Sequence, residues 1–148
     1  MKRILTICCI LMLTFSCGIE ENPIPSVPVY LNLDLNLEDK ELRPIPSFKE
    51  YGSRNINPEI GERAGFGGVL VVHNLFDGFN AFDRTCPYEA NPSITVEVDN
   101  EVLYAVCPKC KTKYEIGGGT GAASGVSKHG LRHYSVTVSG NKLYVRNR

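Results

Sequence analysis

Three cysteines carry the chemistry that this sequence could perform. Cys107 and Cys110 form a Cys-x-x-Cys segment, which is typical of a zinc half-site, a redox disulfide or a cluster-binding loop. Cys86 lies about 20 residues earlier, and proline directly follows both Cys86 and Cys107. Proline fixes the chain as it turns, and successive backbone amides in such loops can point at sulfur and favour the thiolate. The two Cys-Pro loops therefore predict one shared site for a metal, a cluster or a disulfide.

The other cysteines belong to an N-terminal export signal. A basic pair precedes an apolar run over residues 4–15, which is too short to span a bilayer comfortably and is followed by Ser16-Cys17-Gly18. This segment resembles a bacterial lipoprotein signal. The resemblance implies that residues 1–16 are a lipoprotein signal peptide and that Cys17 is the acylated N-terminus of the mature protein. A plain secretory signal cut nearby is the alternative.

The same resemblance implies a place in the cell envelope. Glu20-Glu21 resembles the acidic tether of Bacteroidetes lipoproteins that are exported to the outer surface. We therefore expect a lipid anchor in the outer membrane, with the domain facing the periplasm or the outside. In that oxidising compartment, an odd set of three cysteines implies either one disulfide with a free thiol, or a metal or cluster site that uses all three.

The mature chain is expected to divide into a tether and one domain. Residues 17–28 hold three prolines near their end, which cannot sustain a helix or a central strand, so a stiff spacer is expected over 22–28. The domain is expected over residues 29–148. From Tyr30 to Leu37 apolar and polar residues alternate, which predicts a half-buried strand with four leucines on one face.

Turn residues divide the rest of the domain into β-hairpins. Asp77-Gly78, Asp99-Asn100 and Gly140-Asn141 each separate two short segments with strand-forming residues. Only residues 46–53 and 57–63 leave room for a short helix, because no long 3.6-residue periodicity is present. The sequence therefore predicts a mainly antiparallel β domain with little helix.

Charge is distributed unevenly along a chain that is neutral overall. Residues 18–105 carry 15 acids and 6 bases, whereas residues 106–148 carry 8 bases and one acid. The bases are not interleaved with aromatic side chains of the kind that stack on single-stranded nucleic acid, so no nucleic-acid partner is expected. No nucleophile with a base is evident either, which favours a non-catalytic electron-transfer or binding protein over an enzyme.

The domain resembles the Rieske family from Gly68 to Val145. That family carries Cys-x-His in one loop and Cys-x-x-His in a second, each closing a β-hairpin. The matching segments are Ala81-Phe82-Asp83-Arg84-Thr85-Cys86-Pro87, Cys107-Pro108-Lys109-Cys110, Tyr114-Glu115-Ile116, Gly125, Leu131-Arg132-His133-Tyr134-Ser135-Val136 and Leu143-Tyr144-Val145. The resemblance implies an antiparallel Rieske-like β-sandwich whose two hairpin loops form a [2Fe-2S] site, with Cys86 and Cys107 as ligands.

Both ligand histidines of the family are replaced. Tyr88 stands where the first lies, and Cys110 stands where the second lies. The resemblance therefore implies a cluster on the three cysteines with Tyr88, His129 or His133 as a further ligand, and electron transfer to an unidentified redox partner. Because thiolate in place of imidazole adds negative charge, the potential is expected below the Rieske range.

Two alternatives to the cluster stay open. Zinc on Cys86, Cys107 and Cys110, with one of the same groups as the fourth ligand, fits tetrahedral coordination by nitrogen and sulfur. Alternatively, the fold holds no cofactor, and two of the cysteines form a structural disulfide in a surface module. The second alternative leaves one thiol free.

Overall fold

The computed structural model describes residues 21–148, so the expected signal peptide, residues 1–16, and the expected acylation site, Cys17, lie outside the described residues. The strands are β1 (Val29–Asp34), β2 (Ser47–Tyr51), β3 (Arg63–Ala64), β4 (Val69–His73), β5 (Phe79–Asp83), β6 (Glu97–Val98), β7 (Tyr104–Val106), β8 (Lys113–Glu115), β9 (Ala123–Ser124), β10 (His133–Ser139) and β11 (Lys142–Arg146). Two 3-10 turns, η1 (Lys40–Leu42) and η2 (Pro58–Ile60), are the helical elements of this part. Within residues 21–148, no helix has the length and apolar character of a membrane span.

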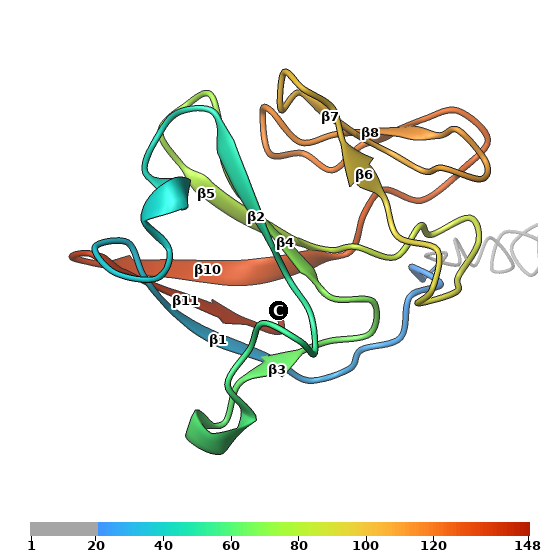
Figure 1. The fold of residues 1–148 in the computed structure, drawn as a ribbon. Coiled ribbons are helices and arrows are strands. Elements are labelled where there is room, and N and C mark those ends of the chain that lie inside the picture. The colour runs from blue at the N-terminus through green and yellow to red at the C-terminus, as the bar shows by residue number, and fades with distance from the viewer. Residues whose placement is uncertain (1–20) are drawn as a thin grey trace, which may run out of the picture.

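Seven strands form one curved antiparallel sheet in the order β2-β4-β5-β10-β11-β1-β3. The sheet turns a corner at β10, because His133 and Tyr134 pair with β5 whereas residues 135–139 pair with β11. The two halves of the sheet therefore enclose an apolar interior (Figure 1). The remaining strands form a smaller sheet in the order β6-β7-β8-β9, which lies to one side of the large sheet in Figure 1.

Strand β4 separates two hydrophobic cores, and all five of its residues are buried. Val69 and Val71 lie in the core inside the curved sheet. Leu70 and Val72 belong to the second core, which includes residues of the small sheet and the loops beside it. The alternation follows from the two-residue period of a strand. Since burying one such side chain stabilises a fold by about 1.5–3 kcal/mol, β4 holds the two layers together.

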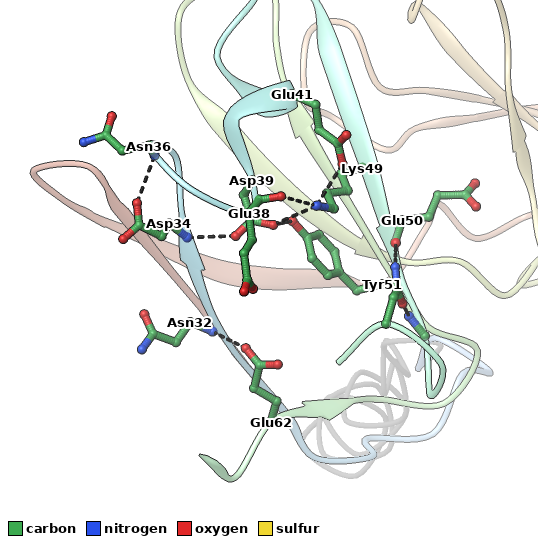
Figure 2. Close-up of polar contacts among 12 residues, drawn as sticks. Asn32, Asp34, Asn36, Glu38, Asp39, Glu41, Lys49, Glu50, Tyr51 and Glu62 are labelled. Atoms are coloured by element: carbon green, nitrogen blue, oxygen red, sulfur yellow. Dashed lines mark hydrogen bonds and ion pairs between the residues drawn. The ribbon is translucent and has the colours of Figure 1, made fainter. Parts of the chain in front are cut away.

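A buried polar cluster fixes the connection from β1 to β2 (Figure 2). Asp39 accepts hydrogen bonds from the Tyr51 hydroxyl at 2.7 Å and from the Asp34 backbone N–H at 2.8 Å. Lys49 Nζ lies 3.1 Å from the Asp39 carboxylate and 2.8 Å from that of Glu41. Burial, followed by the hydrogen bond to Asp39, raises the pKa of Tyr51, so the hydroxyl stays protonated and donates. Because a buried carboxylate needs such donors, the cluster stabilises this connection.

The predicted fold class is confirmed: the described chain is mainly antiparallel β with little helix. The three predicted hairpins form as β4–β5, β6–β7 and β10–β11. The short helix expected within residues 46–53 does not form. Ser47–Tyr51 is a strand instead, because it pairs with β4, although its sequence alternates only weakly between apolar and polar residues. Within residues 57–63, the helix is the single turn η2. Leu37 is exposed rather than on the apolar face, because β1 ends at Asp34 and the chain turns there.

Residues 22–28, where a stiff spacer was expected, lie against the domain. Ile24 is only 1% exposed. Asn22 Nδ2 donates to the Gly130 carbonyl at 2.9 Å, and Arg132 Nη1 donates to the Ile24 carbonyl at 2.8 Å. Because its backbone and its one large apolar side chain find partners there, this segment is part of the folded body from Asn22 onward.

Candidate metal centre

Two loops at the ends of strands bring the three cysteines together. Cys86 begins the loop that follows β5, and Cys107 and Cys110 lie on the loop between β7 and β8. Their three Sγ atoms lie within 4.8 Å of one another. Cys86 Sγ and Cys110 Sγ are 3.6 Å apart, which is close contact between two free thiols. The two Cys-Pro loops therefore face one another, as the sequence pattern predicts.

Each of the two loops contains the same kind of backbone turn. The Cys86 carbonyl accepts a hydrogen bond from the Ala90 N–H at 2.9 Å, and the Cys107 carbonyl accepts one from the Lys111 N–H at 3.1 Å. Ala90 and Lys111 both have positive φ, at 47° and 61°. A left-handed residue at this point reverses the chain after the turn. Each loop is therefore a closed turn that begins with a cysteine, and the two turns are equivalent along the backbone.

Cys86 is buried beside a tyrosine hydroxyl. Cys86 and Cys107 are both 0% exposed and belong to the second core. Burial raises the pKa of the Cys86 thiol to about 11. The Tyr114 hydroxyl and the Glu89 backbone N–H hydrogen-bond the sulfur and favour the thiolate, but these bonds do not outweigh burial. Tyr114 Oη lies 3.2 Å from Cys86 Sγ, and burial raises the pKa of Tyr114, so its hydroxyl stays protonated. Ionising Cys86 near neutral pH therefore needs a nearby cation, such as a coordinated metal.

Cys110 ionises more readily than Cys86. Burial opposes its ionisation, but hydrogen bonds with the Thr112 hydroxyl and backbone N–H, followed by those with Cys86 and Cys107, outweigh burial and lower the pKa of Cys110. Thr112 Oγ1 lies 3.3 Å from Cys110 Sγ and accepts a hydrogen bond from the Ser127 N–H at 3.3 Å. The neutral Cys110 thiol donates to this hydroxyl, and the hydroxyl can donate in return once the thiol is ionised. Thr112 therefore favours the thiolate form of Cys110.

An ion pair joins the two loops. Lys109 Nζ lies 2.6 Å from Glu89 Oε2, and the Glu89 side chain is 9% exposed although that of Lys109 is 65% exposed. The hydrogen bond to Glu89, followed by the charges of Glu89, Cys107 and Cys110, raises the pKa of Lys109. The ion pair thus holds Lys109, one of the bases of residues 106–148, where its positive charge offsets the negative charge of the thiolates.

The histidines expected as a further ligand are not gathered with the sulfurs. In the part of the chain that the structure describes, the three cysteines are the one group of three or more His, Cys, Asp and Glu side chains whose ligand atoms all lie within 4.8 Å of one another. Tyr88 is 57% exposed. His133 Nε2 lies 2.8 Å from the Thr120 carbonyl, and a Cβ on Gly121, where φ is +62°, would come within 2.9 Å of this nitrogen. His129 is half-buried.

The sequence does not predict two contacts of the candidate site, those of Tyr114 and Thr112 with the cysteine sulfurs. Both residues lie on or next to β8, a strand of only three residues. The contact of Tyr114 could have been predicted from the register of the hairpin whose two strands, β7 and β8, are joined by the second cysteine loop. Tyr114 pairs with Ala105, which lies two residues before Cys107 and therefore faces the same side of the sheet.

No family model matches this chain, and no curated protein matches it. Among solved structures, the chain is similar to the ferredoxin of carbazole 1,9a-dioxygenase from Nocardioides aromaticivorans IC177. The likeness has a TM-score of 0.48 and 21% sequence identity, and it covers 83% of this chain and 100% of that chain. What the site can do follows from its own donor set.

Proposed function

We propose that this protein binds a metal through the thiolates of Cys86, Cys107 and Cys110. The observation that carries the proposal is the gathering of all three Sγ atoms within 4.8 Å, from two separate loops. Thiolates are the soft ligands that zinc and iron sites use. Hydrogen bonds from Tyr114 and Thr112 to the sulfurs orient the donors and favour their ionised form, as outer partners do in metal sites.

The spacing of the sulfurs fits one metal ion. Two sulfurs bound at about 2.3 Å to one tetrahedral zinc are about 3.8 Å apart. Cys86 Sγ and Cys110 Sγ are 3.6 Å apart. A [2Fe-2S] cluster distributes its protein ligands over two irons, so ligands of different irons stand farther apart than ligands of one iron. The spacing of this pair therefore supports a single zinc or iron ion, held by three thiolates and one further ligand.

A [2Fe-2S] cluster that transfers electrons is the second candidate function. It is favoured by the donors aimed at Cys86 and Cys110, because hydrogen bonds to sulfur help set the reduction potential of a cluster. The paired Cys-Pro loops, which resemble those of the Rieske family, support it as well. In this form Cys110 has to separate from Cys86, so that the ligands reach both irons.

We also propose that the chain acts at the cell envelope, anchored by lipid at Cys17. The support is the apolar run over residues 4–15 followed by Ser16-Cys17-Gly18. Metabolic labelling with a fatty-acid analogue tests the anchor, and Cys17→Ser is expected to abolish labelling and release the protein from the membrane fraction. A Cys17→Ser protein that still takes up label and stays with the membrane would contradict the anchor.

Metal and sulfide analysis of the anaerobically purified full chain tests the metal site. We expect about one zinc or iron per chain without acid-labile sulfide, and loss of the metal in Cys86→Ser and Cys107→Ser. Cys17→Ser is the matched control and is expected to keep the metal. Paired irons with sulfide and visible absorption would establish the cluster instead. Metal-free protein with a disulfide among the three cysteines, found by non-reducing peptide mapping, would contradict both candidates.

A further inference from the structure

We propose that the carboxylate of Glu89 is the fourth ligand of the metal, which completes a site of three thiolates and one carboxylate. This inference rests on the proposed metal-binding function and names the group that finishes its coordination. A tetrahedral zinc-type site needs four donors, and protein carboxylates supply an oxygen at about 2.0–2.2 Å.

Glu89 holds the position in the first loop that Cys110 holds in the second. Each is the third residue after the first cysteine of its loop, in Cys86-Pro87-Tyr88-Glu89 and Cys107-Pro108-Lys109-Cys110. Each is followed directly by the positive-φ residue that closes the turn onto the cysteine carbonyl. Because the two turns are equivalent, the Glu89 Cα has in the first loop the place that the Cys110 Cα has in the second. From it, Cys110 comes within 3.6 Å of Cys86.

The contacts of Glu89 agree with this placement. Its backbone N–H hydrogen-bonds the Cys86 sulfur. The backbone of Glu89 is therefore in contact with one of the proposed ligands. Its side chain is only 9% exposed, which is uncommon for a glutamate at the surface of a loop. Oε2 pairs with Lys109, the residue that directly precedes Cys110.

A side-chain rotation is needed to complete the site. In this structure the carboxylate is held by Lys109 and lies outside the group formed by the three sulfurs. The proposal requires rotation about the side-chain bonds of Glu89 that brings Oε1 to the ion while Oε2 keeps its contact with Lys109. Lys109 is then the outer partner of a ligating carboxylate, and its charge offsets the excess negative charge of four anionic ligands around a divalent ion.

Titration of the reduced, metal-free full chain with Co2+ tests the assignment. Co2+ bound by thiolates gives charge-transfer bands, and its d–d bands report tetrahedral geometry. Glu89→Gln is expected to keep the charge transfer of three thiolates and to bind Co2+ more weakly by over about 100-fold, beyond what the loss of an outer partner costs. Glu89→Cys is expected to raise the charge-transfer intensity by about one third, because four thiolates then bind in place of three.

Lys109→Gln separates a ligand from a partner in an ion pair. It removes the same ion pair but no proposed donor, so its Co2+ affinity is expected to fall by about tenfold, the lower end of what the loss of an outer partner costs. Exposed Glu97→Gln on β6 is the surface control. Equal weakening by Glu89→Gln and Lys109→Gln, or wild-type affinity in Glu89→Gln, would overturn the assignment while the three-thiolate site stands. A wild-type chain that binds neither Co2+ nor Zn2+ would instead overturn the proposed function, and the Glu89 assignment with it.

Discussion

The Tyr134 hydroxyl donates a hydrogen bond of 2.6 Å to Asp83 Oδ2, and this bond joins β10 to the end of β5, where the chain enters the first cysteine loop. Asp83 is 0% exposed. Its carboxylate also accepts from the backbone N–H groups of Thr85 at 2.8 Å and Phe66 at 3.3 Å. Burial, followed by the charge of Asp83, raises the pKa of Tyr134, which keeps the donor protonated. One carboxylate thus fixes the strand end from which Cys86 is presented.

Tyr134→Phe is expected to destabilise the domain by about 1.5–3 kcal/mol, because it leaves a buried carboxylate without its side-chain donor. Denaturant unfolding of the wild type and the variant measures the difference. Tyr144→Phe on β11 is the matched control and is expected to change stability by less than about 0.5 kcal/mol. Equal stabilities of the two variants would show that the bond to Asp83 contributes nothing.

Tyr114→Phe is expected to weaken metal binding by about 10–100-fold, because it removes the hydroxyl that lies 3.2 Å from Cys86 Sγ and can donate to the thiolate. Competition with a chromophoric chelator measures the affinity for Zn2+. Tyr104→Phe, on the paired strand β7, is expected to bind Zn2+ as the wild type does. Unchanged affinity in Tyr114→Phe would remove this hydroxyl from the site.

In the reduced, metal-free protein, iodoacetamide is expected to modify Cys110 before Cys86 and Cys107. Cys110 is partly exposed, and hydrogen bonds from Thr112 lower its pKa despite burial, whereas burial raises the pKa of Cys86 to about 11. The thiolate is the reacting form. Pulse alkylation near pH 7 followed by peptide mass spectrometry gives the order of labelling, and Thr112→Val is expected to slow the reaction at Cys110. Labelling of Cys86 first would contradict these environments.

Acid is expected to destabilise the turn after β8 through Glu115. Burial works against ionisation of this group, but hydrogen bonds from Thr120 and from the Gly118 backbone N–H outweigh burial and lower the pKa of Glu115. A carboxyl with a lowered pKa in the folded state stabilises the fold above its unfolded pKa, and this contribution is lost as pH falls through the folded pKa. Melting temperatures between about pH 5 and pH 3 should therefore fall less in Glu115→Gln than in wild type. Exposed Glu97→Gln is the control, and parallel pH profiles for Glu115→Gln and wild type would contradict the prediction.

Ile24→Ala is expected to destabilise the domain by about 2–5 kcal/mol, the usual cost of truncating a buried isoleucine. The residue is 1% exposed although it lies in the proline-rich segment. Ile60→Ala, at a position 59% exposed, is the control with the same chemical change. Similar unfolding midpoints for the two variants would mean that residues 22–28 do not contribute to the fold.

The sequence predicts those features whose signals are local. The β10–β11 hairpin follows from Gly140-Asn141 between two strand-forming segments, and the meeting of the cysteine loops follows from two Cys-Pro pairs at strand ends. Strand β2 could not be predicted in this way, because it forms by pairing with β4. The burial of Ile24 depends on hydrogen bonds to Gly130 and Arg132, more than 100 residues away. The Tyr114 contact depends on strand register, which no local pattern specifies.

The double burial of β4 makes the two layers one thermodynamic unit. Since Val69 and Val71 pack in one core and Leu70 and Val72 in the other, neither layer can come apart without exposing a face of this strand to water. Cooperative unfolding in a single transition is the consequence. A ligand that binds only the native state raises the melting temperature of everything that unfolds with its site. An ion held between the two cysteine loops would therefore protect the amides of β1 and β11 from hydrogen exchange, although these strands lie in the other layer.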